Sequence, residues 1–468
     1  HDSNGPSTRD IKTEIQKRAL SGGSGHPVDD TTLAGRHTAS ENTEVTVKHV
    51  ECYDCHNPHA IKAPTGVKGD GDGGRVKGMR YVDIGGTTRN PATGDRQPYI
   101  YEVCFRCHGN TWNQVFNGNV YPTQVTTRPP GMSNKRLEFD PNGVDATYGP
   151  NQSYNSAYHP VASPGKNTTF ALCMQLKYYC TSTGNGAACT DKSAFSTLDC
   201  SSAAAAKTSL GNLTINCTDC HNNNAAGGVA GPITESSLRT TDVSSNYTGT
   251  SPVGPHGSQI ATPALNFYSG VSDNGNRRIL RDYYFTGTLP TTSRPFNAPT
   301  STTEFQNRFK LCFNCHDWNT FYGNNDNTNF FNGNGMMNGG GGMNGMSPSN
   351  LHAYHLNGQG GGMMWASTYE ACMTCHYNIH SNVQATNTDY VGGGSMPPDG
   401  DSHLINFAPN VVTPNGFAKP AWFYSAVNVN MNCNLYCHSC AMNYTYSCTH
   451  SLNNAAGTAN TTDTCNNN

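Results

Sequence analysis

Six short segments of the sequence carry two closely spaced cysteines followed directly by a histidine. Five have the spacing Cys-x-x-Cys-His, in which the two thiols share one face of a helical turn. They can therefore form thioethers with the two vinyl groups of one haem, while the adjacent histidine binds the iron as proximal ligand. The sixth has one more residue between the cysteines. The motifs are Cys52/Cys55/His56, Cys104/Cys107/His108, Cys217/Cys220/His221, Cys312/Cys315/His316, Cys372/Cys375/His376 and Cys433/Cys437/His438.

Zinc binding is the main alternative for such motifs, because zinc ribbons also use Cys-x-x-Cys pairs. A structural zinc site needs two pairs to supply four ligands, whereas here each pair is followed by its own histidine and lies far from the next. The sequence therefore favours six covalently attached haem c groups. For the Cys433/Cys437 motif, which needs a bulged turn, a disulfide or free thiols stay open as alternatives.

Seven further cysteines do not precede a histidine, and four of them cluster in one segment. Disulfides are the natural interpretation outside the reducing cytosol, and four cysteines allow three pairings between which the sequence does not choose. The three near the C-terminus are odd in number, so one is free, pairs with the upstream cluster or bridges to another chain. The disulfide candidates are Cys173, Cys180, Cys189, Cys200, Cys440, Cys448 and Cys465.

Each of the six irons needs a second axial ligand, and histidine or methionine could supply it. The methionines concentrate between Met336 and Met373, mostly in a Gly-Met-Asn tract, which indicates biased composition. Twelve histidines remain after the six proximal ones, so bis-histidine coordination is favoured.

The candidate distal histidines stand beside attachment motifs or in rigid loop sequence. His59 (CHNPH) and His380 (CHYNIH) follow a motif so closely that each would reach a neighbouring haem and not its own. Pro or Gly beside a solitary histidine, as in GHP, YHP and PHG, suits a fixed ligand. The candidates are His59, His26, His159, His256, His355, His380, His352, His49 and His403.

The composition excludes several classes of protein. Hydrophobic residues make up 35% and charged residues 13%, against about 45–50% and about 25% in a typical domain, so the chain cannot build a large side-chain core. The net charge of −3 gives no basic field for nucleic acid, and no apolar run is long enough to span a membrane. The chain opens at His1 without an apolar leader, so we expect a mature exported chain, or a trimmed piece of a longer one.

The expected fold class is mostly coil with short helices and few strands around a core of stacked haems, in one extended unit over residues 1–468. IKTEIQKRAL near residue 11 predicts a helix, TEVTVKHVEC near residue 43 predicts a strand, and each attachment motif predicts a helical turn. The sub-regions are 22–120 with haems 1 and 2, 121–210 with the cysteine-containing insertion, 211–380 with haems 3 to 5, 321–349 as a low-complexity Gly/Asn/Met loop, and 381–468 with haem 6 and the cysteine-rich tail.

The segments SGHPV, HVECYDCHNPHA, CFRCHG, YHPV, NCTDCHNN, GPHGS, LCFNCHD and CHYNIH resemble the outer-surface multihaem c-type cytochromes of metal-reducing, Geobacter-type bacteria. They are similar to the filament-forming outer-membrane cytochromes S and E, the cytochrome nanowires. The resemblance implies stacked haems, the six proximal histidines above, His59 as a distal ligand, and polymers in which one subunit donates a histidine to the next. The chain departs from that family in its Cys433 motif, its Gly-Met tract and its cysteine-rich tail.

The predicted function is electron transfer by an extracellular filament of identical subunits, passing electrons to other cytochromes or external acceptors. A monomeric periplasmic or extracellular shuttle is the first alternative, although a shuttle would use a charged docking face. A multihaem reductase is the second, and it would need an iron with an open site. No Cys-x-x-Cys-Lys variant marks such an iron, so we expect an electron carrier and not an enzyme.

Overall fold

The computed structural model describes a little more than a third of the chain, in separate segments. Up to residue 404 the described residues are 11–20, 23–26, 28, 50–60, 76–109, 135–142, 157–180, 189–192, 195–223, 254–260, 279–282, 302–322, 352, 372, 376, 379–381 and 404. Five strands between 422 and 467 are described by their backbone alone. The described part is mostly irregular, with short helices and few strands.

No described helix exceeds nine residues. The predicted helix near residue 11 is confirmed as α1 followed by a 3-10 turn, whereas the strand predicted near residue 43 lies outside the described residues. None of the described helices is long and apolar enough to cross a membrane. The helices are α1 (Ile11–Gln16), α3 (Cys52–Cys55), α4 (Ile100–His108), α6 (Lys135–Phe139), α7 (Phe170–Lys177), α8 (Ala203–Leu210), α9 (Thr302–Arg308), α10 (Lys310–Phe313) and α11 (Trp318–Tyr322), with 3-10 turns η1 (Lys17–Ala19), η4 (Pro91–Thr93) and η8 (Cys217–Asp219).

All described strand pairs are antiparallel. Three two-stranded ladders join β1 (Ser24–Gly25) to β6 (Gly257–Ser258), β2 (Tyr81–Val82) to β3 (Thr88–Arg89), and β4 (Tyr178–Cys180) to β5 (Cys189–Asp191). A C-terminal sheet orders β10 (Asn460–Thr461), β9 (Tyr446–Asn453), β8 (Asn430–Leu435) and β7 (Trp422–Ser425), with β11 (Thr464–Asn467) also paired to β9. The β1–β6 ladder connects segments that are more than two hundred residues apart in sequence.

The apolar core of the described residues consists of small clusters and not of one continuous interior. One lies beneath α7 and α8 and includes Leu176, Phe195 and Leu210. Another packs Phe105 of α4 against Phe139 of α6. This scarcity agrees with the low apolar content of the sequence, because the stabilisation gained from burial is proportional to the apolar area that the chain can bury.

Helix α4 is fixed at its start by a buried carboxylate. Glu102 is 1% exposed and accepts a hydrogen bond from the main-chain N–H of Tyr99 at 2.9 Å. Arg96 donates two hydrogen bonds to the same carboxylate, at 2.8 and 2.5 Å, and its guanidinium stacks over the ring of Tyr99 at 4.5 Å. This bidentate pair satisfies the charge that burial would otherwise penalise.

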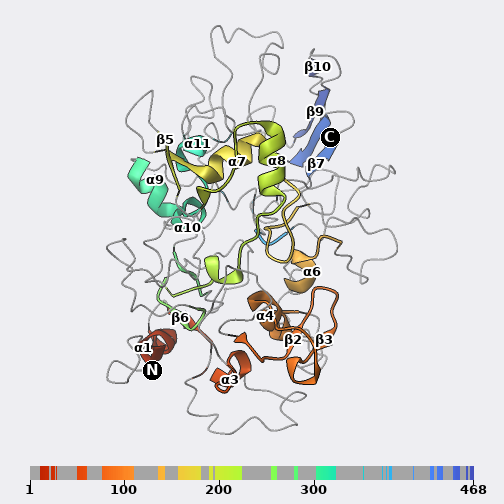
Figure 1. Ribbon diagram of the computed structural model, residues 1–468. Coiled ribbons are helices and arrows are strands. Elements are labelled where there is room, and N and C mark those ends of the chain that lie inside the picture. Colours follow the sequence, from red (N-terminus) through yellow and green to blue (C-terminus); the bar gives the residue numbers. More distant parts are fainter. Residues whose placement is uncertain are drawn as a thin grey trace.

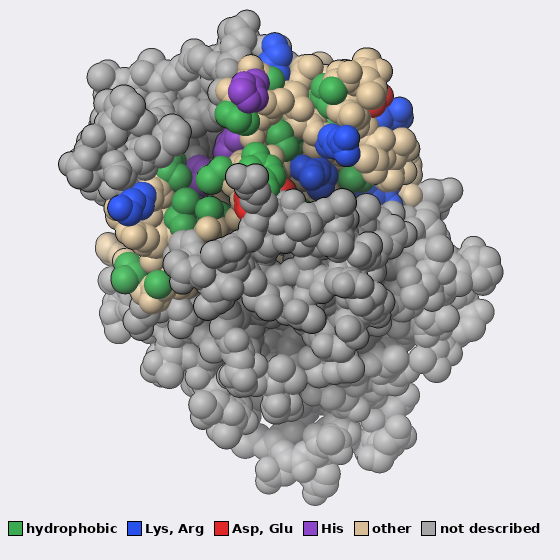
Figure 2. Space-filling model, turned by 90° about the horizontal axis from the view of Figure 1, so that it is seen from below, with side chains coloured by type: hydrophobic (Ala, Val, Ile, Leu, Met, Phe, Trp, Pro, Cys, Tyr) green, Lys and Arg blue, Asp and Glu red, His purple; other side chains and the backbone are tan. Residues whose placement is uncertain are grey.

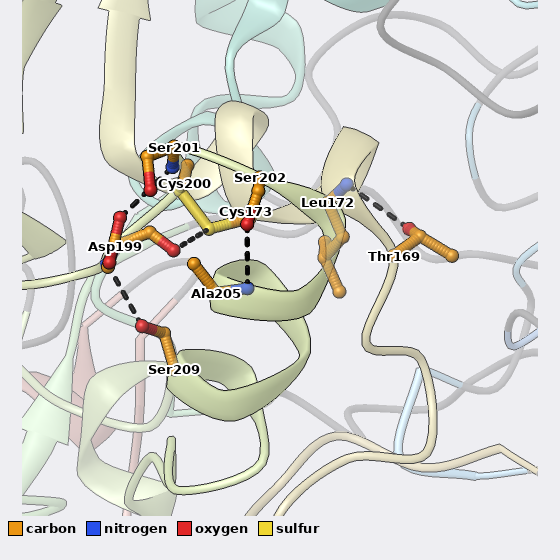
Figure 3. Close-up of a disulfide and its surroundings, with 9 residues drawn as sticks. All are labelled: Thr169, Leu172, Cys173, Asp199, Cys200, Ser201, Ser202, Ala205 and Ser209. Carbon is orange, nitrogen blue, oxygen red and sulfur yellow. Dashed lines mark hydrogen bonds between the residues drawn. A yellow bond between two sulfur atoms is a disulfide. The ribbon is translucent and has the colours of Figure 1, made fainter.

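A disulfide links Cys173 of α7 to Cys200, and it confirms the prediction of disulfides in this segment (Figure 3). Both helices that flank it begin with hydroxyl caps: Thr169 accepts from the N–H of Leu172, and Ser202 accepts from the N–H of Ala205. Such caps satisfy N–H groups that have no partner inside the helix. The bond therefore ties α7 to the segment directly before α8.

The backbone register places Cys180 directly opposite Cys189 in the β4–β5 ladder. The N–H of Lys192 donates to the carbonyl of Lys177 at 2.7 Å, so these two residues form a hydrogen-bonded pair. Alternation along an antiparallel ladder then makes Cys180 and Cys189 a non-hydrogen-bonded pair, with Cα atoms about 4.5 Å apart. That spacing falls within the range of about 4.4–6.8 Å found for disulfides.

We predict that the four cysteines pair as Cys173–Cys200 and Cys180–Cys189. Non-reducing peptide mapping should recover both links, and neither of the two alternative connectivities. The Cys173→Ser/Cys200→Ser variant should lose about 3–4 kcal/mol of unfolding free energy, because the cross-link restricts the unfolded chain. Ser201→Ala serves as the control. A map that linked Cys173 to Cys180 or Cys189 would contradict the register.

Candidate functional site

The attachment motifs form tight turns closed by a recurrent hydrogen bond. The N–H of the motif histidine donates to the carbonyl of the first cysteine at His56, His221, His316 and His376, at 2.8–3.0 Å. The motif of His108 lies within helix α4. The predicted helical turn is thus confirmed for the first four motifs, whereas residues 373–375 of the fifth lie outside the described residues. Each turn brings the two cysteines to one side, which is the arrangement that two thioether bonds to one ring require.

The sixth motif differs. Its first cysteine, Cys433, lies in strand β8 and pairs with His450 of β9, so the expectation of a turn beginning at Cys433 is wrong. Pairing in a sheet has replaced the local turn because the ladder satisfies the same backbone groups. Cys437 and His438 lie outside the described residues, as do Cys375 and Cys440. In the same sheet Cys465 of β11 stands opposite Cys448 of β9.

The first two motifs, carried by α3 and α4, lie next to one another (Figure 1). Arg106 of the second motif donates to the carbonyl of Asp54 in the first, at 2.7 Å. A hydrogen bond with the thiol of Cys217, together with burial, raises the pKa of Cys104. The second and third motifs therefore touch through their cysteines.

The third and fourth motifs are close in the same way. Burial raises the pKa of Cys220, and Cys315 is the next largest contributor. Burial raises the pKa of Cys55 to about 12, with Cys104 and Cys107 adding to it. Each of these contributions requires the thiols to lie within electrostatic reach. The first four motifs thus form a continuous row in the order of the sequence.

Three motif histidines each face a second histidine from a distant segment. The ring centroids of His56 and His256 are 6.2 Å apart. Those of His108 and His26 are 6.4 Å apart, and those of His221 and His380 are 6.0 Å apart. In each pair one member follows a Cys-x-x-Cys sequence, and the other is among the predicted distal ligands.

This separation matches two imidazoles that bind one metal ion from opposite sides. An imidazole nitrogen lies about 2 Å from a first-row metal ion and about 1 Å from its own ring centre, so two such centres are about 6 Å apart. Aromatic rings in direct contact also cover about 4.5–7 Å. The coincidence of one narrow distance with the motif residues in three separate pairs favours the metal-binding interpretation.

Backbone carbonyls hold several of these rings by their Nδ1 atoms. Nδ1 of His26 lies 2.7 Å from the carbonyl oxygen of Pro255, and that of His221 lies 2.9 Å from Ile279. Nδ1 of His376 lies 2.8 Å from the carbonyl oxygen of Leu404, and that of His159 contacts the carbonyl of Ile379. A carbonyl accepts only from an N–H, so each ring keeps Nε2 as a lone-pair donor for a metal.

The distal histidines themselves come in pairs across short ladders. The β1–β6 register of Ser24 with Ser258 places His26 opposite His256 two residues further on. The bridge between Tyr158 and Ser381 likewise places His159 opposite His380, and the N–H of His159 donates to the carbonyl of His380 at 3.1 Å. One backbone pairing therefore positions ligands for two neighbouring sites.

His159 is the distal candidate for the fourth motif. The pKa of His316 is lowered to about 3, first by burial and then by the charge of His159. Burial also lowers the pKa of His108 to about 3, with His26 as the next contributor. These rings therefore stay neutral at physiological pH, which is the form that binds a metal.

The other predicted distal histidines are exposed, packed against an aromatic ring, or outside the described residues. His59 is exposed, and none of the described motif histidines faces it. His352 packs edge-on against Phe321, at 5.0 Å between ring centres, and Phe321 also contacts His316. His49, His355 and His403 lie outside the described residues.

Three buried charged residues near the motifs carry no signal in the sequence. Glu138 contacts His380, Lys192 donates to the carbonyl of Cys315, and Arg281 donates to the carbonyl of Asp219 at 3.3 Å. All three are at most 3% exposed. They come from segments without any motif, so only the folded structure identifies them.

Comparisons with known proteins add no relative. No protein-family model matches the sequence, and neither a curated protein nor a solved structure matches the chain.

We predict that Gly257→Ala disrupts the pairing that positions His256. A Cβ at Gly257 would collide with the backbone oxygen of Glu14 in α1, and such overpacking costs about 1–3 kcal/mol. Thermal unfolding should show the loss. Gly85→Ala is the control, because its Cβ would meet only Asp83 Oδ1, at 3.4 Å. Equal stability of both variants would contradict this close approach.

Proposed function

We propose that this protein is a hexahaem c-type cytochrome that conducts electrons through closely spaced bis-histidine haems. The observation that carries the proposal is the set of three histidine pairs with ring centroids 6.0–6.4 Å apart. Every pair joins a Cys-x-x-Cys-His histidine to a histidine that is distant in sequence. No simpler role explains why the same residue type meets at the same distance beside three separate cysteine motifs.

The described residues would hold each haem in one way. The two motif cysteines form the thioethers, the motif histidine binds the iron on one face, and the facing histidine binds it on the other. The haem supplies the one-electron chemistry of its iron, and the protein sets spacing and ligands. The pairs assigned to the first three haems are His56/His256, His108/His26 and His221/His380, and His316/His159 is assigned to the fourth.

The adjacency of the motifs supports electron transfer along a row. The second and third motifs touch through Cys104 and Cys217, and thioether sulfurs stand at the edge of the ring that they hold. Two rings attached at touching cysteines have their edges close together. An electron can then pass from haem to haem without crossing a long stretch of polypeptide.

We further propose that the chain works outside the cell as the subunit of a filament, as its resemblance to the cytochrome nanowires implies. His59 supports this, because its imidazole is exposed beside the first motif and faces no described motif histidine. Figure 2, which views the molecule from below in the orientation of Figure 1, shows histidine side chains reaching the surface on the described part of that face. An exposed imidazole of this kind suits a haem of a neighbouring subunit.

Haem content and spin state test the electron-transfer proposal. The intact mass of the native protein should exceed that of the polypeptide by six haems. In the His256→Ala variant the same number of haems should remain attached, and about one iron in six should change from low to high spin, because only the first haem loses an axial ligand. His1→Ala should leave the spectrum unchanged. Electron paramagnetic resonance measures both, and a native protein without covalent haem would contradict the proposal.

Electron microscopy tests the filament. The native protein should form filaments with a regular subunit repeat. His59→Ala should yield separate particles that keep all their haems, because the ligand between subunits is lost. Lys207→Ala, at an exposed position of α8, is the control. Discrete native particles would favour the shuttle, and a high-spin haem in the native protein would favour the reductase.

A further inference from the structure

The ring of His380 is held differently from the other described histidines of the row. Its Nδ1 lies 3.1 Å from Oε2 of Glu138 in α6, and Phe139 packs edge-on against the ring at 5.3 Å. Glu138 is completely buried. Lys135, one turn earlier in α6, donates to both carboxylate oxygens at 2.8 and 2.9 Å. At these distances the Nδ1–H of His380 donates to a carboxylate that is stabilised as an anion.

The acceptor is a neutral backbone carbonyl for four other histidines of these sites, namely His26, His159, His221 and His376. Among these five histidines, His380 is therefore the one whose Nδ1 contacts a carboxylate. A carboxylate draws the Nδ1 proton more strongly than a carbonyl does, which makes Nε2 of the same ring a stronger electron donor. A stronger donor stabilises the ferric iron more than the ferrous iron.

We propose that Glu138 is a positioning residue that lowers the reduction potential of the third haem, the one assigned to His221 and His380. This inference depends on the proposed function. The third motif lies between the second and the fourth, as the contacts of Cys104 with Cys217 and of Cys220 with Cys315 indicate. Glu138 therefore makes the reduction potentials uneven along the row of haems, because it lowers the potential of an interior haem.

The principal experiment replaces Glu138 by Gln, which keeps the shape and one acceptor but removes the charge. We expect the equilibrium constant between the ferric and ferrous forms of one haem to change about tenfold toward ferrous, which is about 59 mV for a one-electron couple. Spectroelectrochemical titration measures the potential. The low-spin g values of the same haem should move as well, because they report the donor strength of the axial imidazole.

Glu102→Gln is the matched control. Glu102 is as buried as Glu138 and is also paired with a cation, Arg96, but this carboxylate caps α4 and is not in contact with a histidine in the interactions described above. Its replacement should leave the potential of the third haem unchanged. Circular dichroism and the haem count identify any variant that fails to fold.

The double variant Lys135→Met/Glu138→Gln separates the hydrogen bond from the simple field of the charge. It removes one positive and one negative charge, so the net charge near the haem stays constant while the carboxylate acceptor is lost. The potential should stay raised in this variant. A return to the native value would overturn the inference, and so would unchanged potentials in Glu138→Gln.

These outcomes are distinct from failure of the proposed function. Absence of covalent haem in the native protein would refute the proposed function itself. If six haems are attached but the Glu138→Gln variant has the same reduction potentials as the native protein, only the role of Glu138 is refuted.

Discussion

Three histidine pairs with ring centroids 6.0–6.4 Å apart, which under the proposed function bind one iron from opposite sides, are the feature on which the described structure centres. A side chain with this task must be fixed in position and in rotation. Backbone carbonyls supply the rotation by accepting from Nδ1, as Pro255 does for His26 and Ile279 does for His221. Tight turns closed at His56 and His316 supply the position. Short helices and two-residue strands are sufficient to hold side chains in this way.

This arrangement also explains how a chain so poor in apolar residues can fold. The described apolar clusters are small and lie beside the motifs, with Cys217 against the cluster of Phe105 and Cys315 against that of Leu210. A flat apolar ring inserted between such clusters would bury surface on both of its faces, at about 25 cal/mol per Å². Under the proposed function the haems contribute the interior that the side chains lack, and the Cys173–Cys200 disulfide lies within one of the small apolar clusters and cross-links it.

Local chemistry could be predicted from the sequence, and long-range pairing could not. Cys-x-x-Cys-His spacing specifies its own turn, so the conformation of the first four motifs was predictable, and strand pairing overrode it at Cys433. The rigid neighbours of His26, His159 and His256 marked them as candidate ligands, but did not indicate which motif each would face. That choice is made by ladders between distant segments. His59 appeared the firmest ligand because of its position, yet it is exposed. Glu138 had no local signal because its partner lies far along the chain.

The β1–β6 ladder places His26 opposite His256, and the isolated bridge between Tyr158 and Ser381 places His159 opposite His380. Facing residues of an antiparallel pair have a fixed spacing of about 4.5–5.5 Å, so these pairings fix the distance between the backbones of histidines that, under the proposed function, serve neighbouring irons. The polypeptide that joins the two sides spans 229 and 220 residues, and its length does not enter this spacing. Insertions between the two sides could therefore lengthen the chain while the distance over which an electron must hop stays constant. A slip of one residue would turn both histidines to the opposite face at once, so natural variants should keep the register and differ in the loops.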